Sequence, residues 1–336
     1  MFLARNAQPT FAGIPTFMRA PYTEVDRLVN GAIAVVGIPY DISSNGRAGS
    51  RYGPRGLREA STRFASILSG NESIDCDTGG VINFPGVNEA GVTDLGDIDV
   101  YPLDWNKTKD SIINGVYEIC KAGAIPIILG GDHLLTYPSI VGCKQAVYDA
   151  GKGNVGYIRL SSQLDLGTAH PILGTVWRGT TARNILEDKI VNASNMVWIG
   201  VNGYLPQEEV NLAKEMDVKV HTLKQVRRDG IEKVIMQAIE EASTGCSTVY
   251  LSIDMDVING VYLHSMDIPS FQGLKHVEIR QAINILAKQK IGAVDVVGCN
   301  PISDYMGEGE VVTNFGSAVA FNFISGYLDL ISSNEG

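Results

Sequence analysis

Two acidic motifs in this chain carry side chains suited to binding a metal ion. The first, Gly-Gly-Asp-His, ends at His133, and the second, Ser-Ile-Asp-Met-Asp-Val, places Asp254 and Asp256 two residues apart. Residues two apart at a strand end point to the same side, where two carboxylates repel each other unless a cation or proton lies between them. With an imidazole nearby, such a pair suits a divalent ion such as manganese. A structural interpretation also exists, with the aspartates as caps and His133 as a hydrogen-bonded residue.

Short runs of β-branched and apolar residues alternate with helical patterns along the chain. Several runs are apolar throughout, as expected for a parallel sheet with helices on both faces. The alternation predicts repeated βα units, which we assign to one α/β domain at residues 31–336, after an N-terminal extension at residues 1–30. The predicted strands are residues 32–38, 125–130, 155–160, 196–201, 218–223, 248–254 and 293–298.

The polar motifs directly follow predicted strands. His133 follows strand 125–130, Asp254 closes strand 248–254, and Gly-Cys-Asn-Pro follows the strand that begins at residue 293. The strand at 155–160 leads into Ser-Ser-Gln-Leu-Asp, at residues 161–165. Because ligands of open α/β sheets bind outside the carboxyl ends of the strands, we expect these segments to form one site.

The composition argues against binding to nucleic acids or membrane surfaces. The net charge of the 336-residue chain is −10, whereas both partners require clustered Lys and Arg. The five cysteines are scattered without a Cys-x-x-Cys pair, which predicts free thiols and a cytoplasmic protein. The N-terminus lacks the long apolar run of a signal peptide. The apolar stretch at residues 315–331 includes Asn322 and Asp329 and is expected to form a buried C-terminal helix.

The motifs and their order along the chain resemble those of the ureohydrolases, the family of arginases, agmatinases and related amidinohydrolases. The resemblance covers about residues 30 to 330 and is nearest to the agmatinase and proclavaminate amidinohydrolase branch. It implies a three-layer α/β/α fold with a mostly parallel sheet, a trimer or hexamer, and two manganese ions that hydrolyse guanidines to urea. The motifs that carry it are GIPYD at 37–41, GSRYGPRGLREAS at 49–61, ILGGDH at 128–133, LSIDMDV at 251–257 and DVVGCNP at 295–301.

The central metal motif of that family, Asp-Ala-His-x-Asp, aligns with residues 161–165 without gaps. Ser161 then replaces an aspartate that bridges both metals, and Gln163 replaces a histidine ligand. Because serine and glutamine are neutral and weak ligands, a two-metal centre is not expected. One Mn²⁺ or another divalent ion is compatible with what is left. The ligands that the resemblance implies are His133, Asp165, Asp254 and Asp256.

Further departures fall on the substrate side of the resemblance. Gly298 stands where the family has a glutamate, and Leu173 stands where it has a catalytic histidine. His170 lies three residues from Leu173, so we consider it a substitute for that histidine, although a turn is its alternative role. Asp256 is the other candidate catalytic residue. By position, the cleft is expected to be lined by Trp177, Arg178 and His264.

Three functions follow from this combination. The first is a non-catalytic or repurposed ureohydrolase homologue, acting as a small-molecule binder or as a partner subunit of active paralogues. The second is a hydrolase that releases urea from an agmatine-like guanidino or amidino compound with one metal. The third uses Cys299 as a nucleophile with His170 or His264 as its base, against the alternative of a buried thiol. In each case we expect a homo-oligomer or a hetero-oligomer with a paralogue.

Overall fold

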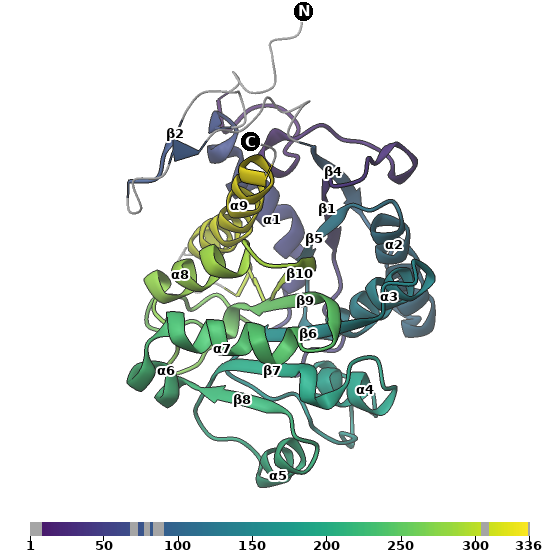
Figure 1. The fold of residues 1–336 in the computed structure, drawn as a ribbon, viewed down its shortest axis with the longest axis vertical. Coiled ribbons are helices and arrows are strands. Elements are labelled where there is room, and N and C mark those ends of the chain that lie inside the picture. The colour runs from purple at the N-terminus through teal and green to yellow at the C-terminus, as the bar shows by residue number, and fades with distance from the viewer. Residues whose placement is uncertain (1–8, 68–72, 77–80, 83–90, 304–308, 335–336) are drawn as a thin grey trace, which may run out of the picture.

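The computed structural model describes residues 9–67, 73–76, 81–82, 91–303 and 309–334 (Figure 1). Residues 1–8 of the predicted N-terminal extension therefore lie outside the described part. Within it, the chain forms one eight-stranded sheet in which every neighbouring pair is parallel. In spatial order the strands are β4 (Val92–Asp97), β1 (Ile33–Ile38), β5 (Ile125–Gly130), β10 (Ile291–Val297), β9 (Cys246–Asp254), β6 (Asn154–Leu160), β7 (Met196–Val201) and β8 (Lys219–Thr222).

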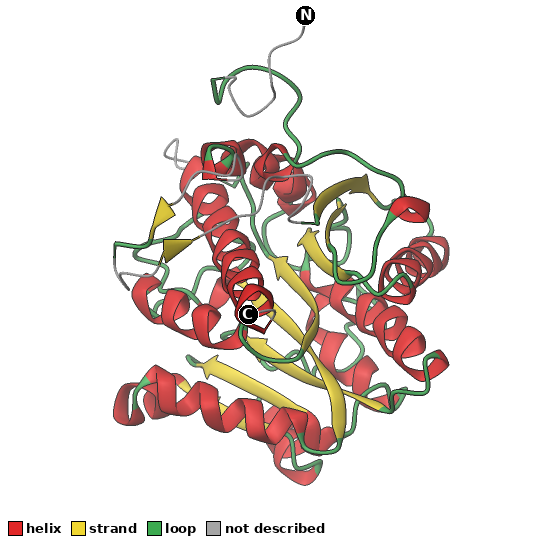
Figure 2. Ribbon diagram, turned by 45° about the horizontal axis from the view of Figure 1, so that its top comes forward, coloured by secondary structure: helices red, strands yellow, loops and turns green. Residues whose placement is uncertain are grey.

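Helices cover both faces of this sheet (Figures 1 and 2). Alternate strand residues feed two separate apolar cores, as the period of two in a strand requires. On β1, for example, Val35 belongs to one core and Val36 to the other. The predicted three-layer α/β/α fold is thus confirmed. One face carries α1 (Gly53–Ser61), α6 (Leu223–Asp229), α7 (Ile231–Ser243), α8 (His276–Leu286) and α9 (Gly309–Asn334), and the other carries α2 (Trp105–Lys121), α3 (Thr136–Asp149), α4 (Thr181–Glu187) and α5 (Gln207–Glu215).

The strands that carry the polar motifs are neighbours in the middle of the sheet. Their order is β5, β10, β9, β6, and Val297 at the end of β10 pairs with Asp254 at the end of β9. Leu160, the last residue of β6, pairs with Ile253 of β9. The four segments after these strands therefore meet at one edge of the sheet, as predicted.

Edge strand β4 was not predicted from the sequence. Its segment, Val-Thr-Asp-Leu-Gly-Asp, is only partly buried and carries two aspartates. Asp94 is buried because Arg58 of α1 donates two hydrogen bonds to its carboxylate. This long-range ion pair allows an acidic residue in a strand, and a local pattern cannot reveal it.

The apolar stretch at residues 315–331 lies within α9, as expected. Val319, Ala320 and Phe323 of this helix are buried in the same core as Leu286 of α8. Among the described residues, no helix combines the length and apolar character that crossing a membrane requires.

Candidate metal centre

Three side chains converge at the carboxyl edge of the sheet. His133 begins a short 3-10 helix after β5, Asp254 ends β9, and Asp165 follows β6. His133 Nδ1 lies 2.7 Å from Asp254 Oδ2 and 3.6 Å from Asp165 Oδ2. One ligand atom from each of the three residues lies within 4.8 Å of the others, and all three are buried. The structure thus gathers three of the four predicted metal ligands.

Hydrogen bonds from below fix the orientation of His133. Its Nε2 lies 3.0 Å from Ser252 Oγ, and that hydroxyl donates to Asp295 Oδ1 at 2.6 Å. Because the hydroxyl proton is used on Asp295, Ser252 accepts from Nε2–H of the histidine. Nδ1 therefore faces the two carboxylates, as a metal-binding imidazole would.

Asp254 has a second, structural role that the sequence also suggested. Its Oδ1 accepts a hydrogen bond from the backbone N–H of Asp256 at 3.0 Å and caps the 3-10 helix Met255–Val257. Its Oδ2 stays directed at His133. Burial by itself would raise the pKa of Asp254, but His133, Arg178 and Arg159 outweigh it and lower the pKa below its usual range. The carboxylate is therefore ionised.

Asp256, the fourth predicted ligand and a predicted catalytic residue, is held apart from the group of three. Ser161 Oγ donates to its Oδ1 at 3.1 Å, and Ser162 donates through its backbone N–H at 3.0 Å and through its hydroxyl to Oδ2 at 2.9 Å. Burial and the charge of Asp254 raise the pKa of Asp256 to about 7. Gln163 donates its backbone N–H to Ser161 Oγ at 3.2 Å. The substituted segment thus binds a carboxylate of the cleft.

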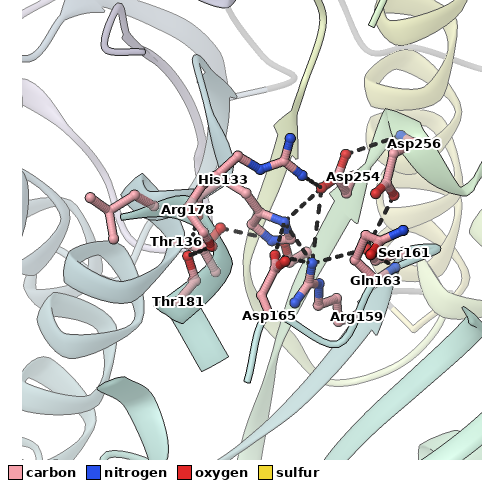
Figure 3. A network of polar contacts seen from close by, with 12 residues as sticks. His133, Thr136, Arg159, Ser161, Gln163, Asp165, Arg178, Thr181, Asp254 and Asp256 are labelled. Atoms are coloured by element: carbon pink, nitrogen blue, oxygen red, sulfur yellow. Dashed lines mark hydrogen bonds and ion pairs between the residues drawn. The ribbon is translucent and has the colours of Figure 1, made fainter. Parts of the chain in front are cut away.

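Arg159 also lies in the cleft, and sequence reasoning missed it. It sits on β6 with no exposed surface, and its Nη2 lies 2.5 Å from Asp165 Oδ2, 3.0 Å from His133 Nδ1 and 2.9 Å from Ser161 Oγ (Figure 3). Burial would lower the pKa of Arg159, but Asp165 and the other nearby acidic groups raise it above its usual value. Its position in the sequence could have indicated this role, because Arg159 lies two residues before Ser161 and side chains two apart in a strand point to the same side.

Arg178, predicted to line the cleft, is a second buried cation. It begins the 3-10 helix Arg178–Thr180, is 3% exposed, and directs its guanidinium at Asp254 (Figure 3). Its Nη2 lies 3.9 Å from Asp254 Oδ2. Burial alone would lower the pKa of Arg178, but Asp165, Asp254 and Asp267 outweigh it and raise the pKa. A guanidine substrate would meet this positive charge.

The other predicted residues do not reach the carboxylates. His170 lies in a tight turn, where its Nδ1 accepts from the backbone N–H groups of Ile172 and Leu173, both at 3.2 Å. Trp177 is half-buried and donates its indole N–H to Thr168 O at 3.2 Å. His264 is exposed. In the described part of the chain, no hydrogen bond or ion pair links these three side chains to His133, Asp165 or Asp254.

The cysteine hypothesis finds no support in the geometry. Cys299 is fully buried, and burial followed by the charge of Asp254 raises its pKa, so the thiol stays protonated. Within the described residues, neither His170 nor His264 forms a hydrogen bond with it.

The neighbouring Gly298 has φ +77°, and a Cβ there would lie 2.8 Å from Asp254 Oδ1. A larger side chain at this position would displace Asp254.

The donor set of His133, Asp165 and Asp254, one imidazole nitrogen and two carboxylates, suits a single divalent ion. A second ion would need ligands from residues 161 and 163, which here are a hydroxyl and an amide engaged with other groups. The space beside the three donors is occupied by Arg159 Nη2. The residues therefore do not fit the two-ion centre, and they fit one ion only if Arg159 moves.

The fold and the cleft together define a three-layer α/β/α protein with an acidic site at the carboxyl edge of its parallel sheet. Residues 31–324 match the arginase family, and the chain belongs to that family. It is similar to proclavaminate amidinohydrolase of Streptomyces clavuligerus, with 26% identity over 95% of this chain and 96% of the relative. It is also similar to guanidinopropionase of Pseudomonas aeruginosa, with 27% identity over 89% of this chain and 88% of the relative.

Solved structures agree with this assignment. The structure of proclavaminate amidinohydrolase from Streptomyces clavuligerus aligns with a TM-score of 0.79 and 25% identity, covering 96% of this chain and all of that one. Formimidoylglutamase from Bacillus subtilis aligns with a TM-score of 0.80 at 21% identity, covering 97% of this chain and 96% of that one, which supports the fold alone.

Proposed function

We propose that this arginase-family protein does not hydrolyse guanidines by the two-manganese route and serves as a repurposed small-molecule binder or as a partner subunit of active relatives. The observation that carries the proposal is the use of Ser161 and Ser162. Their hydroxyls, with one backbone N–H, bind Asp256, where the family motif supplies metal ligands. Hydrogen bonds from Ser161 and Ser162 thus stabilise the Asp256 carboxylate in place of a metal ion.

Electrostatics supports this reading. Two divalent ions about 3.5 Å apart repel each other by about 20 kcal/mol at an effective dielectric of about 20, and bridging carboxylates must offset that repulsion. Ser161 cannot bridge in this way, and two buried guanidinium groups, of Arg159 and Arg178, add positive charge to the same cleft. Losing several cooperating groups removes the reaction as a unit.

One feature favours a second candidate, a one-metal amidinohydrolase that releases urea from an agmatine-like compound. His133, Asp165 and Asp254 still supply a set of donors that could hold an ion, and a single bound ion lowers the pKa of its water. The similar proteins are named guanidinopropionase, guanidinobutyrase and proclavaminate amidinohydrolase, which makes guanidino acids reasonable compounds to test.

A urea-release assay separates the two candidates. The native protein, purified with and without added Mn²⁺, is incubated with agmatine, arginine, guanidinobutyrate, guanidinopropionate and guanidine. We expect no urea above the background of a heat-denatured sample. Turnover that disappears in Asp254→Ala but persists in Asp329→Ala, a control carboxylate on α9, would refute the proposal, and one ion per chain by elemental analysis of that active protein would establish the one-metal enzyme.

Binding of the same guanidino compounds, measured by calorimetry without turnover, would support the role as a small-molecule binder. Co-purification and co-expression with an active relative, followed by sizing of the complex, tests the role as a partner subunit. A protein that neither binds these compounds nor alters the activity or assembly of such a relative would contradict the positive half of the proposal.

A further inference from the structure

We propose that the guanidinium of Arg159 is the resident cation of this cleft and takes the place of the metal ion that His133, Asp165 and Asp254 would otherwise bind. The inference deepens the proposed function, because it names what holds the acidic site together. It concerns the occupant of the cleft, so it can fail while the proposal about guanidine hydrolysis stands.

The first support is convergence on a single atom. Arg159 Nη2 lies within hydrogen-bond distance of three polar atoms: Asp165 Oδ2 at 2.5 Å, Ser161 Oγ at 2.9 Å and His133 Nδ1 at 3.0 Å. Two of these atoms belong to the set of three possible metal ligands. Polar atoms from the segments after β5 and β6 thus surround one cationic atom, as the ligands of a metal site surround their ion.

The second support is the orientation of the histidine. Its Nε2 lies 3.0 Å from Ser252 Oγ, so Nδ1 faces the cleft. There Nδ1 lies 2.7 Å from Asp254 Oδ2 and 3.0 Å from Arg159 Nη2. The guanidinium and the carboxylate therefore share the ring edge at which a metal ion would bind.

The third support is exclusion. Nη2 is nearer to Asp165 Oδ2, at 2.5 Å, than His133 Nδ1 is to the same oxygen, at 3.6 Å. An ion bound to both ligand atoms would therefore touch the guanidinium, which is positively charged and has no lone pair to offer. Arg159 is also fully buried, and its Nη1 donates to Leu164 O at 3.2 Å, which ties the side chain in place.

The buried carboxylate of Asp165 is paired with Arg159. Removing Arg159 would leave the buried carboxylate of Asp165 without its closest partner, and Arg178 would be the remaining cation near it. An uncompensated buried charge strongly destabilises a fold or attracts a counterion. A divalent ion then becomes the natural replacement, because the imidazole and the two carboxylates are already in place.

The test compares the native protein with Arg159→Met, which keeps a similar length and loses the charge. Both are stripped with EDTA and titrated with Mn²⁺, with stoichiometry read by calorimetry and by elemental analysis after gel filtration. We expect far less than one ion per chain in the native protein and about one in the variant. Arg55→Met, which removes an exposed arginine paired with Glu59, is the matched control and should gain no ion.

Two further variants show where the ion binds. The gain should disappear in Arg159→Met/Asp165→Asn, and Arg159→Lys, which retains a cation, should bind less Mn²⁺ than Arg159→Met. A native protein that binds one Mn²⁺ per chain and loses it in Asp254→Asn would overturn the inference. So would a folded Arg159→Met that gains none.

Thermal unfolding gives an independent measurement if Arg159→Met is poorly folded. In EDTA its midpoint should lie below that of the native protein, and adding Asp165→Asn should restore part of the loss by removing the unpaired charge. A double variant no more stable than Arg159→Met would overturn the inference. Urea release by the native protein bears on the proposed function, whereas Mn²⁺ at His133 without urea release bears only on this inference.

Discussion

Ser162 binds the carboxylate of Asp256 with both of its donors. The backbone N–H reaches Oδ1 at 3.0 Å, and the hydroxyl reaches Oδ2 at 2.9 Å. Fork-like hydrogen bonding of this kind satisfies a buried carboxylate without a metal. The segment after β6 therefore still binds the end of β9, through hydrogen bonds within the chain.

Replacing Ser162 with alanine should destabilise the protein. The change removes a hydrogen bond to a buried acidic group, which typically costs about 1.5–3 kcal/mol. Chemical denaturation should show this loss in the free energy of unfolding. Ser247→Ala, which removes a hydroxyl that donates to Asn154 O at a solvent-exposed site, is the control and should cost less than about 1 kcal/mol. Equal losses in the two variants would contradict the role assigned to Ser162.

Restoring the family motif should be insufficient while Arg159 remains. We expect Ser161→Asp/Gln163→His to bind less Mn²⁺ per chain than the same pair combined with Arg159→Met, because the guanidinium repels the ions. Elemental analysis of the desalted proteins measures this directly. The same metal content in the double and triple variants would indicate that Arg159 is not the obstacle.

Gly298→Ala should be more damaging than a comparable glycine substitution elsewhere. Its Cβ would lie 2.8 Å from Asp254 Oδ1, in addition to the backbone strain at φ +77°. Gly151→Ala is a matched control, since it has φ +68° and no atom within 4 Å of the added carbon. Both should lose about 1 kcal/mol from the backbone term, and Gly298→Ala should lose more from the steric one. Equal free energies of unfolding for Gly298→Ala and Gly151→Ala would contradict the close contact between residue 298 and Asp254.

Cys299 should be among the last cysteines to react with an alkylating reagent. The thiol is fully buried and its pKa is raised by burial, whereas Cys76 is exposed. Because the thiolate is the reactive form, iodoacetamide at neutral pH should label Cys76 first. Peptide mass spectrometry over time gives the order. Labelling of Cys299 ahead of Cys76 would revive the cysteine nucleophile.

The sequence predicted the framework of the fold because that framework is locally encoded. Apolar runs such as residues 125–130 and 196–201 match β5 and β7 as observed. Helices α4 and α6 were not assigned from the sequence. Each has seven residues, too short for a repeating apolar stripe to stand out.

The candidate site was predictable only in part, for a similar reason. His133, Asp165 and Asp254 follow strands whose order puts them together, so their convergence follows from topology. Arg159 lies inside an apolar strand, and its role depends on Asp165 and His133, which reach it only in three dimensions. The placement of Arg178 beside Asp254 likewise depends on a loop, which periodicity does not describe.

Asp295 accepts hydrogen bonds from Ser252, Thr136 and Tyr250, at 2.6, 2.8 and 2.7 Å. These bonds orient Ser252, which in turn orients the imidazole of His133 through Nε2. None of them involves residues 159 to 163. Protein engineers could therefore replace residues 159 to 163 while the Ser252 contact keeps the orientation of His133. The scaffold offers a ready starting point for installing a catalyst of new design.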